Sequence, residues 1–128
     1  MRKALIFDPY LDTLGGGERY SLTFALACHL KDYAVEIAWP NDKIFSEAKS
    51  RFGLDISFAK TNPAAYNFFT SSTNIISKFF FTRKYNLIFW LSDGSIPFLF
   101  SQNNILHFQY PFSSLRLNPV AKNKLKFI

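Results

Sequence analysis

The sequence predicts an α/β protein of the Rossmann-like type, with an open parallel sheet of about five strands and helices on both faces. Two observations support this prediction. Short apolar runs of strand length alternate with longer amphipathic stretches along the 128 residues. The glycine triplet at 15–17 stands between the first apolar run and the first helical stretch. Ligands of such folds bind at the carboxyl ends of the strands, so we expect the loops there to carry function.

The first strand, loop and helix give the clearest signal. Residues 4–7 (ALIF) form a continuous apolar run ended by Asp8 and Pro9, typical of a strand buried on both faces. The polar, glycine-rich stretch 8–17 is expected to be a loop. From Glu18 to Leu30, apolar side chains cover most of a helix surface. This helix should therefore pack against the sheet.

The remaining elements repeat the alternation of strands and helices. Gly53 should end the second helix, and Pro111 should break the last strand. In order, we expect a strand at 34–39, a helix from about residue 43 to Phe52, a strand at 54–58, a helix or helix pair at 64–82, and strands at 85–91 and 104–109.

The charge composition favours an anionic partner. The chain carries 15 Lys and Arg against 9 Asp and Glu, a net charge of +6. The basic residues lie in separate places, whereas nucleic-acid-binding proteins gather them along one face. We therefore expect no nucleic-acid partner.

The chain is expected to be cytoplasmic, on the basis of its cysteine content and its first residues. A single cysteine, Cys28, cannot form an internal disulfide and fits a reducing compartment. The first strand begins within three residues, which leaves no room for a signal peptide. The longest apolar runs fall short of the roughly 20 residues of a membrane-spanning helix. Any membrane contact should therefore be peripheral, on the inner face.

The glycine triplet 15–17 predicts an anion site. Without side chains, backbone N–H groups can approach an anion, and the N-terminus of the following helix adds its dipole. A connecting turn without function is the alternative. Two known phosphate loops do not match, because Glu18 and Arg19 stand where a GxxxxGK[ST] loop needs Lys and Ser or Thr, and Tyr20 replaces the last glycine of a dinucleotide fingerprint. A nicotinamide cofactor is therefore not expected.

Three segments together resemble a known family. They are 16-GGER-19 between a short strand and an apolar helix, 85-YNLIFWLSDG-94 and 104-NILHFQYPF-112. In this pattern the chain resembles the N-terminal domain of GT-B glycosyltransferases, especially the family 4, or group 1, enzymes. The resemblance implies that residues 1–128 form a single acceptor-side domain, truncated relative to the family's first domain and without the donor-binding C-terminal domain.

The resemblance also implies roles for the glycine-rich loop. Gly15, Gly16, Gly17, Glu18 and Arg19 would approach the diphosphate of a nucleotide-sugar donor. Two alternatives stay open: Glu18 can instead complement the helix dipole, and Arg19 can be a solvated surface residue.

Residues near the ends of the last two predicted strands are the other site candidates. His107 would face the cleft and act as the catalytic group that hydrogen-bonds a sugar hydroxyl, unless it is a core histidine bonded to backbone. Gln109 occupies the position at which some relatives have that histidine, and it would bind the acceptor. Asp93 would bind acceptor hydroxyls, although Ser-Asp-Gly is also a plain turn signature. No metal or cofactor is implied.

The partners implied are a nucleotide-sugar, a glycan or lipid-linked acceptor, and a separate chain that supplies the C-terminal domain. The basic and aromatic segment 79–84, with Phe68 and Phe69, is typical of interfacial helices and suggests a peripheral membrane contact. Core packing of the same phenylalanines is the alternative. We expect little transferase activity without the second domain. A non-catalytic module that binds a phosphate ligand or a partner protein is the competing hypothesis.

Overall fold

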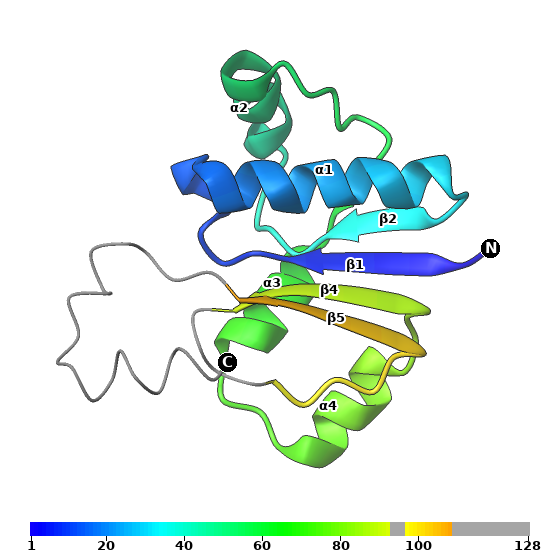
Figure 1. Ribbon diagram of the computed structural model, residues 1–128. Coiled ribbons are helices and arrows are strands. Elements are labelled where there is room, and N and C mark those ends of the chain that lie inside the picture. Colours follow the sequence, from blue (N-terminus) through cyan, green and yellow to red (C-terminus); the bar gives the residue numbers. More distant parts are fainter. Residues whose placement is uncertain (93–96, 109–128) are drawn as a thin grey trace, which may run out of the picture.

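The computed structural model describes residues 1–92 and 97–108 and has the predicted α/β architecture (Figure 1). Its five strands are all parallel, in the order β3-β2-β1-β4-β5. The strands are β1 (Lys3–Phe7), β2 (Ala34–Ile37), β3 (Lys60–Thr61), β4 (Leu87–Ser92) and β5 (Asn103–Phe108). The helices are the short 3-10 helix η1 (Leu11–Thr13) and α1 (Gly16–Leu30), α2 (Lys43–Phe52), α3 (Pro63–Thr70) and α4 (Ile75–Thr82).

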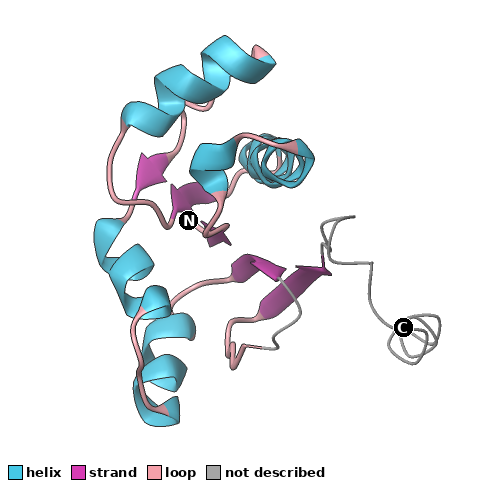
Figure 2. Cartoon of the chain, turned by 90° about the vertical axis from the view of Figure 1, so that its left-hand side faces the viewer, coloured by secondary structure: helices cyan, strands magenta, loops and turns pink. Residues whose placement is uncertain are grey.

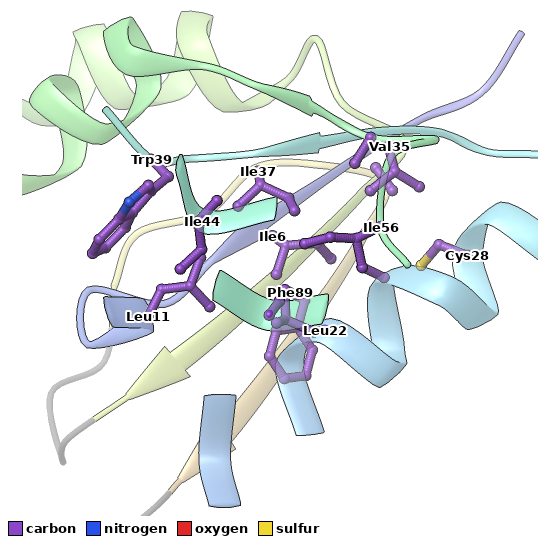
Figure 3. Packing of buried hydrophobic residues seen from close by; sticks show 14 of the residues in the cluster. Ile6, Leu11, Leu22, Cys28, Val35, Ile37, Trp39, Ile44, Ile56 and Phe89 are labelled. Carbon is purple, nitrogen blue, oxygen red and sulfur yellow. The ribbon is translucent and has the colours of Figure 1, made fainter. Parts of the chain in front are cut away.

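Helices cover both faces of the sheet, as predicted. α1 and α2 lie on one face, and α3 and α4 lie on the other (Figures 1 and 2). The central strand β1 supplies both cores, because successive side chains of a strand point to opposite faces. Ile6 packs with Leu22 of α1 and Ile44 of α2 (Figure 3). Leu5 joins the second core, with Ala65 of α3.

A small polar network attaches α3 to the second face of the sheet. The Tyr85 hydroxyl donates a hydrogen bond to Glu36 Oε1 on β2 (2.9 Å), and Asn62 Nδ2 donates to the same oxygen (2.8 Å). Asn62 also caps α3, since its side-chain oxygen accepts from the Ala65 N–H (2.9 Å). Burial, followed by the nearby Glu36 charge, raises the pKa of the Tyr85 hydroxyl. Tyr85 therefore stays protonated and keeps donating to Glu36.

The predicted strand at 54–58 is wrong. The third strand is the two-residue β3, Lys60–Thr61, paired with β2. The Asp55 carboxylate accepts a hydrogen bond from the Ser57 N–H (3.0 Å), and this Asx turn bends the chain where a strand would need to be extended. Ile56 is nevertheless buried, because the loop packs against the first core.

The other differences are shifts of element boundaries. Helix α1 begins at Gly16 rather than Glu18, and the predicted loop 8–17 contains η1. The segment 64–82 forms the helix pair α3 and α4, each begun by an asparagine cap, Asn62 and Asn74. The strands predicted at 34–39 and 85–91 are β2 and β4, which span 34–37 and 87–92.

In the part of the chain that the structure describes, no helix has both the length and the apolar character needed to cross a bilayer.

Candidate functional site

The glycine-rich loop lies where β1 ends and α1 begins, at the carboxyl edge of the sheet (Figure 1). Leu14, in the left-handed region at φ 49°, turns the chain toward the helix. Gly15 is the N-cap of α1, and Gly16 and Gly17 open its first turn. Gly15 and Gly16 are exposed, whereas Gly17 is buried. The backbone of α1's first turn is therefore open to solvent at Gly15 and Gly16.

The space beside Gly16 is large enough for a ligand atom. A Cβ built on Gly16 would meet no heavy atom within 4 Å, and its backbone is not in the left-handed region. Neighbouring protein atoms would therefore allow a side chain at this position. Because Gly16 has none, the N–H groups that a helix N-terminus presents to anions are not covered.

Glu18 turns back toward the start of its own helix. It stands three residues after the N-cap, the position of the acidic residue in a capping box. Its Oε1 accepts a short hydrogen bond from the Thr13 hydroxyl (2.6 Å), and its Oε2 would lie 3.6 Å from a Cβ on Gly15. The side chain is 6% exposed. Glu18 thus ties η1 to the first turn of α1 and complements the helix dipole.

Asp8 is a second buried carboxyl group beneath the same turn. It directly follows β1 and is 1% exposed. Its Oδ1 accepts a hydrogen bond from the Tyr10 N–H (3.0 Å). Burial raises the pKa of Asp8 to about 7, with a further contribution from the negative charge of Glu18 and a smaller one from Asp12. Asp8 therefore changes its charge near neutral pH.

The Ser21 hydroxyl joins Asp8 to the first turn of α1, and its hydrogen bond to the carboxylate partly opposes the rise in the pKa of Asp8. The Ser21 hydroxyl oxygen lies 3.0 Å from Asp8 Oδ2 and 3.0 Å from the Gly17 carbonyl oxygen. A serine hydroxyl has one proton, so it can donate to only one of these oxygens at a time. When it donates to Gly17, the contact with Asp8 is a hydrogen bond only if Asp8 is the donor. This arrangement links the protonation of Asp8 to the first turn of α1.

His107 lies on β5, one residue before its end, and contacts α1. Its ring stacks in parallel on Tyr20, with centroids 4.2 Å apart and an interplanar angle of 10°. The His107 side chain is half-buried and Tyr20 is 51% exposed. The histidine is therefore held beside the second turn of α1. Its partner Tyr20 follows the glycine-rich loop by only three residues. The catalytic role of His107 stays a prediction.

An open hollow of about 750 Å³ lies beside the loop, between Leu14 and the exposed side of α2. Its lining combines an apolar side chain, hydroxyl groups and both signs of charge. The lining residues are Leu14, Ser46, Glu47, Ser50 and Arg51. Hydroxyls and charged groups of this kind can hydrogen-bond a polar ligand such as a sugar.

The sequence-predicted site residues divide into three groups. Gly15 to Arg19 lie together at one turn, and Arg19 is exposed there. His107 lies beside the same helix through Tyr20. Asp93 and Gln109 lie outside the described residues. Within 1–92 and 97–108, no three His, Cys, Asp or Glu side chains come together as ligands of a metal ion.

The sequence-based site does not include Asp8, Thr13 or Ser21, which the structure brings to the glycine-rich loop. Asp8 ends the first predicted strand, and a polar residue directly after a buried parallel strand lies at the functional edge of the sheet. The position of Asp8 could therefore have predicted its place at the site. No sequence pattern predicts the hydrogen bonds between Thr13 and Glu18 and between Ser21 and Asp8, because they depend on the path of the loop.

Comparisons with protein-family models, with curated proteins and with solved structures find no match to this chain.

Proposed function

We propose that this chain is the acceptor-side domain of a GT-B glycosyltransferase. It would take part in moving a sugar from a nucleotide-sugar to a glycan or lipid-linked acceptor. The observation that carries the proposal is the exposed turn at Gly15 and Gly16, which opens α1 at the carboxyl edge of a parallel sheet. In parallel α/β folds this edge binds ligands, and a glycine-rich helix N-terminus suits a diphosphate.

In this proposal the main-chain amides of the exposed Gly15 and Gly16 meet the donor diphosphate, the buried Gly17 supports the turn, and the exposed Arg19 adds a positive charge. Glu18 acts through the loop rather than on the ligand, since its carboxylate is buried and bonded to Thr13. Asp8 sets the local charge. When it is ionised, it opposes an anion at the turn, so the diphosphate should bind more tightly with Asp8 protonated.

The acceptor would approach from the side of the loop that faces α2. The hollow between Leu14 and α2 supplies space, hydroxyl groups and the Arg51 guanidinium. His107, Asp93 and Gln109 are proposed to contact sugar hydroxyls from the strand ends. Transfer would also require a donor-binding domain on a separate chain, because the loop alone supplies few of the groups that stabilise a transition state.

Calorimetric titration of the 128-residue chain with uridine, guanosine and adenosine diphosphate sugars tests the proposal. At least one should bind, and Gly16→Val should abolish the binding without unfolding the protein, because its side chain occupies the open space at the turn. Ala27→Val is the matched control, since Ala27 is exposed on α1 but lies three turns away. Its affinity should equal that of the unchanged chain.

Failure of every nucleotide-sugar to bind, or equal binding by the Gly16→Val protein, would contradict the proposal. Binding that never leads to sugar transfer, even with any neighbouring gene product present, would instead favour the non-catalytic phosphate-binding module.

A further inference from the structure

The outer surface of α4 carries an unusual set of exposed apolar side chains. Ile76 is 65% exposed and Phe80 is 59% exposed, on consecutive turns of one helix side. The opposite side of α4 faces the protein through the buried Thr82. Phe98 and Phe100 extend the exposed surface beyond the helix. We call this surface the α4 patch, formed by Ile75, Ile76, Phe79, Phe80, Phe98 and Phe100.

Ring contacts join part of the α4 patch, and cations lie beside it. The Phe79 and Phe100 rings meet edge to face at 5.2 Å, which joins the helix to the segment before β5. Lys78 Nζ lies 5.9 Å from the Phe98 ring centre, and the Arg83 guanidinium lies 5.1 Å from that of Phe79. Lys84 is also exposed next to Arg83, with its Nζ 5.4 Å from the ring centre of Phe81. Several large exposed apolar groups with cations beside them mark a contact site rather than ordinary surface.

The α4 patch lies in a part of the chain that has cations but no acids. Residues 56–92 and 97–108, the described part of the second half of the chain, contain four Lys and Arg and no Asp or Glu, a net charge of +4. Residues 1–55 contain seven Lys and Arg and eight Asp and Glu, a net charge of −1. The partner of the α4 patch should therefore be anionic.

Charge argues against two simple ways of covering the α4 patch. Residues 109–128 contain four Lys and Arg and no acid, so their charge does not complement the cations beside the patch. A second copy docked through the same patch would bring Lys78, Arg83 and Lys84 against their own counterparts.

We propose that the α4 patch docks on an anionic lipid bilayer, with Ile76, Phe80 and Phe98 entering the headgroup boundary and Lys78, Arg83 and Lys84 contacting lipid phosphates. Aliphatic and aromatic side chains together suit an acyl boundary, and the flanking cations suit anionic headgroups. Single-stranded RNA would also meet cations and rings, but it offers nothing for the exposed isoleucines to enter. The contact is peripheral and does not depend on the proposed transferase function.

Sedimentation of the full chain with vesicles of phosphatidylglycerol and phosphatidylcholine tests the proposal. Binding should need the anionic lipid and fall as salt is raised. Arg83→Gln with Lys84→Gln should weaken it about 25-fold at low salt, at about 1 kcal/mol per charge. Ile76→Ser with Phe80→Ser should weaken it about tenfold or more, including at high salt.

Matched controls remove the same groups elsewhere. Lys43→Gln with Lys49→Gln lowers the net charge equally on the exposed side of α2, and Leu30→Ser removes a side chain that is 72% exposed on α1. Both should bind as the unchanged chain does, and thermal melting should show every variant folded.

Three results would overturn the proposal: no binding to anionic vesicles, equal binding to vesicles of phosphatidylcholine alone, or equal losses in the control variants. Binding of single-stranded RNA that Phe80→Ser removes and Ile76→Ser leaves unchanged, without binding to anionic vesicles, would also overturn it and assign the patch to nucleic acid. Nucleotide-sugar binding at Gly16 is measured separately, so each proposal can fail alone.

Discussion

The core under α1 and the outer side of α4 use phenylalanine in opposite ways. On the α1 face, Phe89 is fully buried and stacks on Phe24 at a centroid distance of 4.6 Å. On the α4 face, Phe79 and Phe80 meet each other at 5.4 Å but are 39% and 59% exposed. Phe89 belongs to the core beneath the glycine-rich loop. The rings on α4 leave apolar surface exposed to solvent, so the 16 phenylalanines of the sequence do not have one role.

The largest expected difference is between the effects of Phe89 and Phe80 on the stability of the protein. Phe89→Ala should lower the free energy of unfolding by about 3–5 kcal/mol, because it opens a cavity in the core. Phe80→Ala should change it by less than about 0.5 kcal/mol, because that ring is mostly in water. Urea denaturation measures both, and Phe89→Leu gives a milder core variant if Phe89→Ala does not fold. Equal losses at the two positions would refute the assignment of core and surface.

The next largest effect concerns the buried carboxyl under the loop. The pKa of Asp8 is raised from 3.8 to about 7 by folding, so the folded state holds a proton that the unfolded state has released. Stability from this group should therefore fall as pH rises from 3.8 to about 7. Asp8→Asn should remove this loss and stabilise the protein by about 2–4 kcal/mol at pH 8 but not at pH 4.

Unfolding of both proteins at the two pH values checks this prediction. Asp12→Asn is the control, because Asp12 is exposed and contributes least to the shift. A stabilisation by Asp8→Asn that does not vary with pH would argue against a proton on Asp8.

A smaller effect is expected on the α3 face of the sheet. Tyr85→Phe removes the hydroxyl that donates to Glu36 and should cost about 1–2 kcal/mol, since the hydrogen bond is to a charged group. In the Tyr85→Phe protein, Glu36→Gln should then lower the free energy of unfolding by less than it does in the unchanged protein. A double-mutant cycle in urea measures this coupling, and additive losses would mean that the two side chains act independently.

The smallest expected effect is in the loop itself. Thr13→Val removes the hydrogen bond to Glu18 and should cost about 0.5–1.5 kcal/mol. Amide hydrogen exchange at 15–17 should speed up, because the loop loses its tie to α1, while exchange in α4 should not change. Thr23→Val, on the exposed side of α1, is the control. Unchanged exchange in the loop would show that Thr13 does not hold it.

The sequence predicted those parts of the fold that depend on continuous apolar runs. β1 and β4 are buried in the middle of the sheet, so nearly every residue of 4–7 and 87–92 had to be apolar. The edge strand β3 could not be placed, because only two residues pair and the Asp55 turn diverts the more apolar segment before them. Local hydrogen bonds of this kind compete with strand pairing without changing the apolar pattern.

The candidate site was predictable only in part. The glycine triplet 15–17 predicted an exposed start of the first helix. Its position after β1 predicted that this helix start lies at the carboxyl edge of the sheet. The buried state of Asp8 and its contact with Ser21 arise from how α1 packs over the loop. No spacing rule in the sequence encodes that packing.

The most direct test of the central claim is an NMR titration of the labelled chain with uridine, guanosine and adenosine diphosphates. We predict that at least one shifts the amide signals of Gly15, Gly16 and Gly17, with smaller shifts at Tyr20 and His107. Signals of Ile76 and Phe80 in the α4 patch should stay in place. Shifts confined to other regions, or none with any of the three nucleotides, would contradict a ligand site at the glycine-rich loop.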